Sequence, residues 1–152
     1  MLSKNEMMIL ANLRQNSRQS LANISRNTNI PVSTVYDKIK YHENRVIKKF
    51  TSILDFPALG FNIRANVLVK GNKKELRDFL LNNWNVNSVF QLNEGYDFAV
   101  DCIFRYMSEL KEFIEQLEKM GVKKEVYFVI NELRREDFLN SAKYLNNIND
   151  VG

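Results

Sequence analysis

Hydroxyl, aromatic and charged side chains gather in one short stretch of the chain, between residues 33 and 49. Small hydroxyls donate hydrogen bonds to phosphates or base edges, and lysine and arginine cations attract phosphates. We therefore expect bases to be approached by Ser33, Thr34, Tyr36, Asp37 and Lys40. The phosphate backbone would be held by Lys38, Tyr41, Arg45, Lys48 and Lys49.

Two short helices joined by a tight turn must position these side chains. The apolar residues of each helix share one face, and they are Leu21, Ile24, Val35 and Ile39. Asn29 tolerates the left-handed conformation of a sharp turn, and Pro31 has a φ angle that suits a helix start. Residues 20–41 therefore predict a helix-turn-helix that reads DNA.

Two amphipathic helices with a polar turn also occur in small helical proteins that bind no DNA. In that alternative, Tyr36 and Tyr41 would pack between helices. The distribution of charge favours DNA binding: residues 1–55 carry a net charge of +5, and residues 56–152 carry −1, within a total of +4. A basic segment beside a neutral one is typical of a module that binds a polyanion.

Other classes of site find little support in the sequence. Cys102 and His42 are the only cysteine and histidine, so an intrachain disulfide and a cysteine-based zinc site are excluded. We expect no catalytic residue, metal or cofactor, and we expect His42 to lie on the surface or at a helix end. No apolar run is long enough to span a membrane, and the first residues do not resemble a signal peptide, which predicts a cytoplasmic protein.

The elements around the helix-turn-helix predict a winged domain over residues 1–53. Ser3 and Glu6 have the spacing of a capping box at the start of a first helix. Residues 46–54 are rich in β-branched and aromatic residues, which predicts a β-ribbon after the third helix. Lys48 and Lys49 would then lie on the wing. Residues 54–60 contain proline and glycine and are interpreted as a linker.

Residues 61–131 predict a second domain with the order β-α-β-β-α-β. Strands are expected at 61–69, 86–92, 96–104 and 125–130, and helices at 73–84 and from Ser108 to Gly121. This α+β pattern is that of a ferredoxin-like fold. Residues 132–152 form an extension that is expected to be part helix.

The open face of the ferredoxin-like sheet suggests a dimer. Both helices of this fold lie on one face, yet the last strand places apolar residues on both faces, including Val126 and Tyr127. A large open apolar face is unfavourable in water. We therefore expect two copies to pack sheet against sheet in a symmetric homodimer.

The chain resembles the Lrp/AsnC ("feast/famine") family of prokaryotic transcriptional regulators over about residues 2–130. The resemblance is carried by STVYDKIK at 33–40, LDFPALGF at 54–61 and NEGYDF at 93–98. It implies a regulator that binds double-stranded DNA through a winged domain and forms dimers, which often assemble into octamers. It also implies that an amino acid or related effector binds between subunits, near Asn93, Glu94, Gly95, Tyr96 and Asp97.

The sequence departs from the family pattern after the third helix. Relatives usually read Leu-Glu-x-x-Gly-Val-Ile there, whereas residues 42–47 lack the glycine, so we expect a different turn. Lys38 stands where arginine is common and lacks the bidentate fork that binds guanine. Glu94 replaces a threonine, and with Asp97 it would favour a cationic effector or an α-ammonium group. A solvated turn is the alternative for these two carboxylates.

Two other functions share this architecture. Siroheme decarboxylases resemble the family and are thought to use basic and histidine side chains, but the second domain here has no histidine. The other alternative is an architectural protein that coats DNA with little sequence preference, and the third helix does not exclude it.

Overall fold

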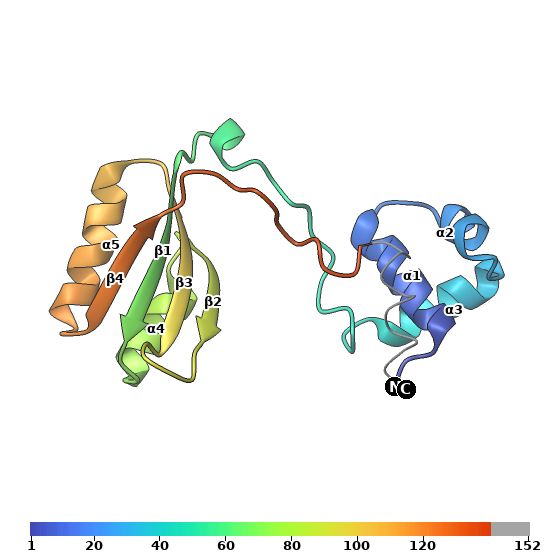
Figure 1. Cartoon of the computed structure of the whole chain (residues 1–152), viewed down its shortest axis with the longest axis horizontal. Helices are drawn as coiled ribbons and strands as arrows, with labels where there is room; N and C mark the ends of the chain where they lie inside the picture. The colour runs from blue at the N-terminus through green and yellow to red at the C-terminus, as the bar shows by residue number, and fades with distance from the viewer. Residues whose placement is uncertain (141–152) are drawn as a thin grey trace. The chain divides into compact units, whose positions relative to one another are not determined.

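The computed structural model describes residues 1–140, which belong to two compact units (Figure 1). The N-terminal unit contains Met1–Ile53 and the chain from Arg134 onward, and the sheet unit contains Leu54–Leu133. No helix among the described residues is long and apolar enough to cross a membrane.

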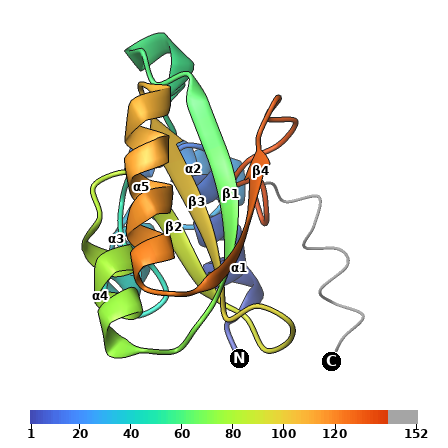
Figure 2. The ribbon, with the colours of Figure 1, turned by 90° about the vertical axis from the view of Figure 1, so that its left-hand side faces the viewer.

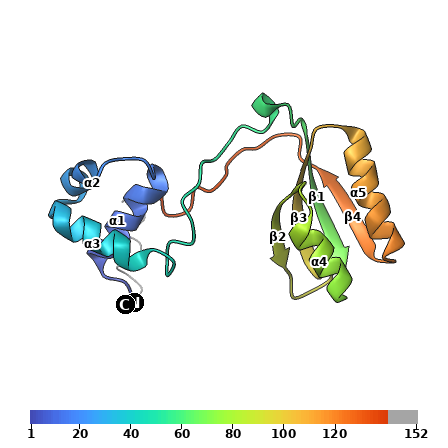
Figure 3. The same cartoon turned by 180° about the vertical axis from the view of Figure 1, so that it is seen from behind.

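Three helices build the N-terminal unit: α1 (Lys4–Gln15), α2 (Leu21–Thr28) and α3 (Val32–His42) (Figure 3). The predicted capping box is present, since the Ser3 hydroxyl accepts from the backbone N–H of Glu6. The Ser20 hydroxyl caps α2 by accepting from the backbone N–H of Asn23. Asn29 ends α2 with φ 56°, the left-handed conformation that lets α3 turn away. The apolar faces of the three helices meet in a core of Ile9, Ile24, Ile30 and Val35.

The predicted β-ribbon at residues 46–54 is wrong for the single chain. Residues 44–46 form a turn closed by the His42 carbonyl, which accepts from the backbone N–H groups of Arg45, Val46 and Ile47 at 3.0–3.1 Å. A single bridge joins Glu43 to Ile47, and no strand follows until residue 63. The run from 48 to 56 contains no glycine or asparagine, the residues that favour a tight hairpin turn, and it does not fold back on itself as a two-stranded ribbon.

The sheet unit has the predicted ferredoxin-like fold. Its elements are β1 (Ile63–Lys70), α4 (Lys74–Asn82), β2 (Val86–Gln91), β3 (Phe98–Phe104), α5 (Met107–Lys119) and β4 (Lys123–Phe128). The strand order is β2-β3-β1-β4, with antiparallel neighbours throughout. Both helices cover one face of the sheet, as Figure 2 shows. Alternating residues of β1 (Ala65, Val67 and Val69) are fully buried against them, as the period-two pattern predicted.

The ends of α5 confirm one prediction and correct another. Gly121 follows the helix with φ 67°, as expected for a C-terminal glycine. Ser108, predicted to begin this helix, lies inside its first turn, because the helix begins at Met107. The carboxylate of Glu109 satisfies this end by accepting from the backbone N–H groups of Arg105 at 2.7 Å and Tyr106 at 3.1 Å.

The sheet face opposite the helices has a polar centre, and the prediction of an apolar face was incomplete. Asp101 accepts two hydrogen bonds from Arg64, at 2.8 and 2.9 Å, and a third from Asn87 at 2.8 Å. The Asp101 carboxylate is the main cause of the raised pKa of Arg64. Around this group lie apolar side chains, of which Phe90 and Tyr127 are more than half exposed. Sequence alternation could not reveal that Arg64 and Asp101 neutralise each other across two strands.

Residues beyond β4 return to the N-terminal unit. Arg14 of α1 donates hydrogen bonds to the backbone carbonyls of Glu136 and Phe138, both at 3.0 Å. No helix forms within 132–140, and the rest of the predicted C-terminal extension lies outside the described residues.

Candidate nucleic-acid interface

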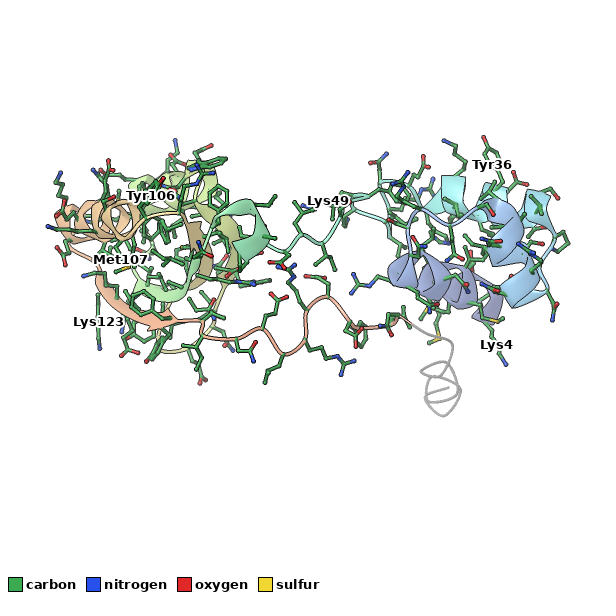
Figure 4. The ribbon with its side chains drawn as sticks, turned by 90° about the horizontal axis from the view of Figure 1, so that it is seen from above. Lys4, Tyr36, Lys49, Tyr106, Met107 and Lys123 are labelled. Carbon is green, nitrogen blue, oxygen red and sulfur yellow. The ribbon has the colours of Figure 1, made fainter. Side chains whose placement is uncertain are left out.

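One row of α3 side chains is presented to solvent. Ser33, Tyr36, Asp37 and Lys40 follow the spacing i, i+3, i+4 and i+7, and all four are exposed. We call these residues the outer face of α3. The opposite side of the helix is fixed by Val35, which is fully buried in the core. Tyr36 projects from the side of the unit opposite Lys4 in Figure 4. Four of the residues predicted to approach bases are therefore together on one accessible surface.

The fifth predicted residue, Thr34, and its helical neighbours form a second row. Thr34 and Lys38 are half-buried, and Tyr41 is 55% exposed. The Lys38 ammonium lies 3.1 Å from the Glu6 carboxylate on α1, so its charge is already engaged within the unit. A shallow hollow between α1 and α3 is lined by Glu6, Asp37, Lys38 and Tyr41.

Glu6 joins the start of α1 to the end of α3. One carboxylate oxygen accepts from the backbone N–H of Ser3 at 2.8 Å, and the other lies 3.1 Å from Lys38 and 3.2 Å from His42 Nε2. These contacts lower the pKa of Glu6 to about 2, and the hydrogen bonds to Ser3 have the largest effect. The predicted position of His42 at a helix end is correct, but the ring is buried, with 2% exposed.

Sequence reasoning assigned Glu6 to the capping box and missed its second role. The signal for the cap is local, because Ser3 and Glu6 are three residues apart. The contacts to α3 span 32 and 36 residues, and no local pattern encodes them. Glu6 therefore orients the helix that carries the candidate interface.

The cations beyond α3 are available to a ligand. Arg45, Lys48 and Lys49 are exposed, and within the described part of the chain none of them has an acidic partner. The Arg45 guanidinium lies 4.2 Å from the centre of the Tyr41 ring, a cation–π contact that places both side chains beside the outer face. Lys40 differs, because it forms an ion pair with Glu43 at 3.3 Å.

The loop between β2 and β3 contains the predicted effector residues. Asn93, Glu94 and Gly95 are exposed, with Gly95 at φ 73°. The Asp97 carboxylate accepts from the backbone N–H of Gly71 at 2.7 Å, so part of its hydrogen-bonding capacity is used within the sheet unit.

Tyr96 lies in the same loop and faces a charged neighbour. The Glu125 carboxylate is the main cause that raises the pKa of Tyr96 to about 12. Residues 1–140 contain no cluster of three or more histidine, cysteine or acidic side chains suited to a metal. The loop therefore offers polar and aromatic groups, and nothing in it resembles a metal site.

Comparisons with known proteins place this geometry among transcriptional regulators. An uncharacterized HTH-type transcriptional regulator of Pyrococcus horikoshii is 30% identical over 135 residues, which cover 86% of this chain and 91% of the relative. The HTH-type transcriptional regulator FL11 of the same species is 32% identical over 111 residues, covering 70% and 74%. No protein-family model matches the chain.

Solved structures share the fold at lower identity. The feast or famine regulatory protein of Mycobacterium tuberculosis, complexed with L-methionine, has a TM-score of 0.81 at 14% identity, covering 89% of this chain and 96% of that one. A transcriptional regulator of Neisseria meningitidis, also in complex with L-methionine, has a TM-score of 0.78 at 19% identity, covering 89% and 94%.

Proposed function

The chain belongs to the Lrp/AsnC family of transcriptional regulators, and from this premise we propose how it binds its DNA. The outer face of α3 enters the major groove, where Ser33, Tyr36, Asp37 and Lys40 contact base edges. Arg45, Lys48 and Lys49 bind the phosphate backbone beside it. The observation that carries this proposal is the exposed outer face of α3, followed by three cations that have no acidic partner among residues 1–140.

Lys38 has a smaller role in this proposal than the sequence indicated. Its ammonium faces Glu6 at 3.1 Å, so binding a phosphate would cost that ion pair. Tyr41 contacts Arg45 through its ring, and from that position its hydroxyl donates a hydrogen bond to the phosphate backbone of the DNA. The phosphate contacts therefore depend mainly on residues 45–49, which follow the helix.

The same proposal includes a homodimer formed through the open face of the sheet. Exposed Phe90 and Tyr127 supply apolar area, and the Arg64–Asp101 pair lies between them with its charges satisfied. Two copies related by a twofold axis would present two α3 helices to half-sites about one DNA turn apart, roughly 34–36 Å. Assembly of such dimers into octamers is part of the proposal and is measured by light scattering.

An amino acid is the proposed effector, bound near residues 93–97. Two structural neighbours hold L-methionine, which supports an amino acid as the ligand class. Glu94 is exposed and can accept from an ammonium group, whereas Asp97 already accepts one backbone hydrogen bond and keeps capacity for another. A thermal-shift screen across the amino acids tests this, and a lack of preference for basic ones would remove the role of the two carboxylates.

The DNA-binding proposal is tested with a pair of double variants. Replacing Lys48 and Lys49 by alanine removes two phosphate contacts per subunit, so the slope of log affinity against log salt should become shallower by about 1.8 per bound subunit, or about 3.6 for the dimer. Replacing Lys73 and Lys74 by alanine is the matched control, because both are exposed lysines at the start of α4 in the sheet unit. Equal slopes for the wild type and the first variant, or an equal change in the control, would contradict the proposal.

Neither alternative function is favoured by the contacts of the chain. The single histidine is buried in the N-terminal unit and hydrogen-bonded to Glu6, so it does not face an accessible substrate cleft. A coating protein would protect any DNA equally. Footprinting with competitor DNA separates it from a regulator, which protects a defined site and resists the competitor.

A further inference from the structure

We propose that Asp37 makes this regulator select a cytosine at one position of each half-site. This inference rests on the proposed entry of α3 into the major groove, and it adds the identity of a base. The carboxylate accepts a hydrogen bond from the N4 amino group of cytosine. Asp37 thereby contributes to specificity, while the cations around it contribute to affinity.

The first support is the position of Asp37 in the middle of the outer face. Ser33 lies one turn before it and Lys40 lies one turn after it, and all three are exposed. Asp37 is two residues from the fully buried Val35, a rotation of about 200° around the helix, so it projects away from the core. Any duplex that contacts the outer face therefore meets this carboxylate.

The second support is that Asp37 is uncommitted. Within residues 1–140 its carboxylate has no hydrogen-bond or ion-pair partner. The two lysines nearest along α3 pair with other acids: Lys38 with Glu6 at 3.1 Å and Lys40 with Glu43 at 3.3 Å. Lys40 is three residues from Asp37 and three residues from Glu43 along the chain, and it forms its ion pair with Glu43. The structure thus leaves one acid free on a surface that approaches a polyanion.

The hydrogen-bonding groups of DNA determine which of them the Asp37 carboxylate can bind. An ionised carboxylate only accepts hydrogen bonds, and phosphate oxygens offer none, so contact with the backbone is repulsive. In the major groove, guanine presents two acceptors, thymine one acceptor and a methyl group, and adenine a donor beside an acceptor. Cytosine presents its amino donor with no acceptor on the same base. It is therefore the base on which an isolated carboxylate gains a hydrogen bond without facing a lone pair of that base.

The test is in vitro selection of bound duplexes from a random-sequence library by the full chain. Four proteins are compared: the wild type, Asp37→Ala, Asp37→Asn and, as control, Glu112→Ala. Glu112 is an exposed acid of α5 without an ion-pair partner among the described residues, so its loss matches the charge change alone. Circular dichroism verifies that each variant is folded.

We expect the wild type and Glu112→Ala to enrich the same motif, with one cytosine per half-site that Asp37→Ala no longer selects. Asp37→Asn should shift that position toward adenine, because an amide pairs with the adenine N6 and N7. Changing this cytosine in the selected duplex should weaken wild-type binding about 5- to 150-fold and Asp37→Ala binding less than 2-fold. Binding to random duplex should be no weaker in Asp37→Ala than in the wild type.

Two results would overturn the inference, and they differ in what they say about the proposed function. If Asp37→Ala enriches the wild-type motif unchanged at every position, Asp37 reads no base and sequence-specific binding still stands. If the wild type enriches no motif, sequence-specific binding and the role of Asp37 both fail.

Discussion

The two units of the molecule are stabilised in different ways. Among the described residues, the sheet unit buries a cluster of twelve apolar side chains between its sheet and two helices, whereas the N-terminal unit buries a cluster of four. Small domains bury a smaller fraction of their surface and are less stable. The N-terminal unit compensates with local polar contacts: the caps at Ser3 and Ser20, and the Glu6 contacts to α3.

The surface proposed to read DNA thus belongs to the less strongly packed unit. Its orientation depends on a carboxylate and a buried imidazole as well as on apolar contacts. We therefore expect substitutions to have different consequences in the two units, and three experiments test this expectation.

The largest effect is expected from truncating one fully buried side chain in each unit. Ile24 and Leu80 are both 0% exposed, and replacement by alanine costs about 2–5 kcal/mol at either site. Ile24→Ala should unfold the N-terminal unit at 25 °C, because its core is small, while Leu80→Ala should leave the sheet unit folded with a lower melting temperature. Hydrogen exchange followed by mass spectrometry resolves the two units peptide by peptide.

Wild-type protein under the same conditions is the control for that measurement. The contrast between the units would fail if Ile24→Ala left α1–α3 as protected as in the wild type. It would also fail if Leu80→Ala unfolded the sheet unit at the same temperature.

A smaller effect is expected from acid. Folding lowers the pKa of Glu6 from its ordinary value of 4.5 to about 2. The ionised carboxylate therefore stabilises the folded N-terminal unit, and this contribution is complete at pH values above 4.5. That contribution should be lost as the pH falls from 4.5 toward 2, where the folded state also binds the proton. Glu6→Gln should flatten this dependence in the N-terminal unit and leave the sheet unit unchanged, as measured by urea denaturation between pH 2 and 7. Parallel pH dependences in the wild type and Glu6→Gln would show that Glu6 is not the group responsible.

The smallest effect is expected at the residue with left-handed backbone conformation that follows a helix in each unit. Asn29 after α2 and Gly121 after α5 both have positive φ, at 56° and 67°. Gly121→Ala should cost about 1 kcal/mol, because alanine resists this conformation while its Cβ would meet no atom within 4 Å. Asn29→Gly should stabilise the N-terminal unit by less than 1 kcal/mol or leave it unchanged. Thermal unfolding measures both, and a stabilised Gly121→Ala would contradict the strain argument.

Local patterns were sufficient for the three helices of the N-terminal unit and for the order of elements in the sheet unit, but not for the residues that follow α3. The capping box at Ser3, the left-handed Asn29 and the alternation along β1 each depend on neighbouring residues, and the structure confirms all three. The order of strands and helices followed from these patterns, because a ferredoxin-like fold has few other solutions.

Non-local contacts and one unusual turn could not be predicted from the sequence. Asn44 adopts φ 61°, and the turn over residues 44–46 closes on the His42 carbonyl where a ribbon was expected. Glu6 and Arg64 each find a partner on another element, at separations that no periodicity encodes. The candidate interface could be located from sequence, but which of its charges are free could not.

The contacts of Arg14 also set an order of events during synthesis. Its acceptors, the carbonyls of Glu136 and Phe138, leave the ribosome only after the entire sheet unit has been made. Because domains fold as units from the N-terminus onward, α1–α3 form before these carbonyls exist. In the nascent N-terminal unit, the Arg14 guanidinium is therefore hydrated, and its hydrogen bonds to Glu136 and Phe138 replace water when the chain returns.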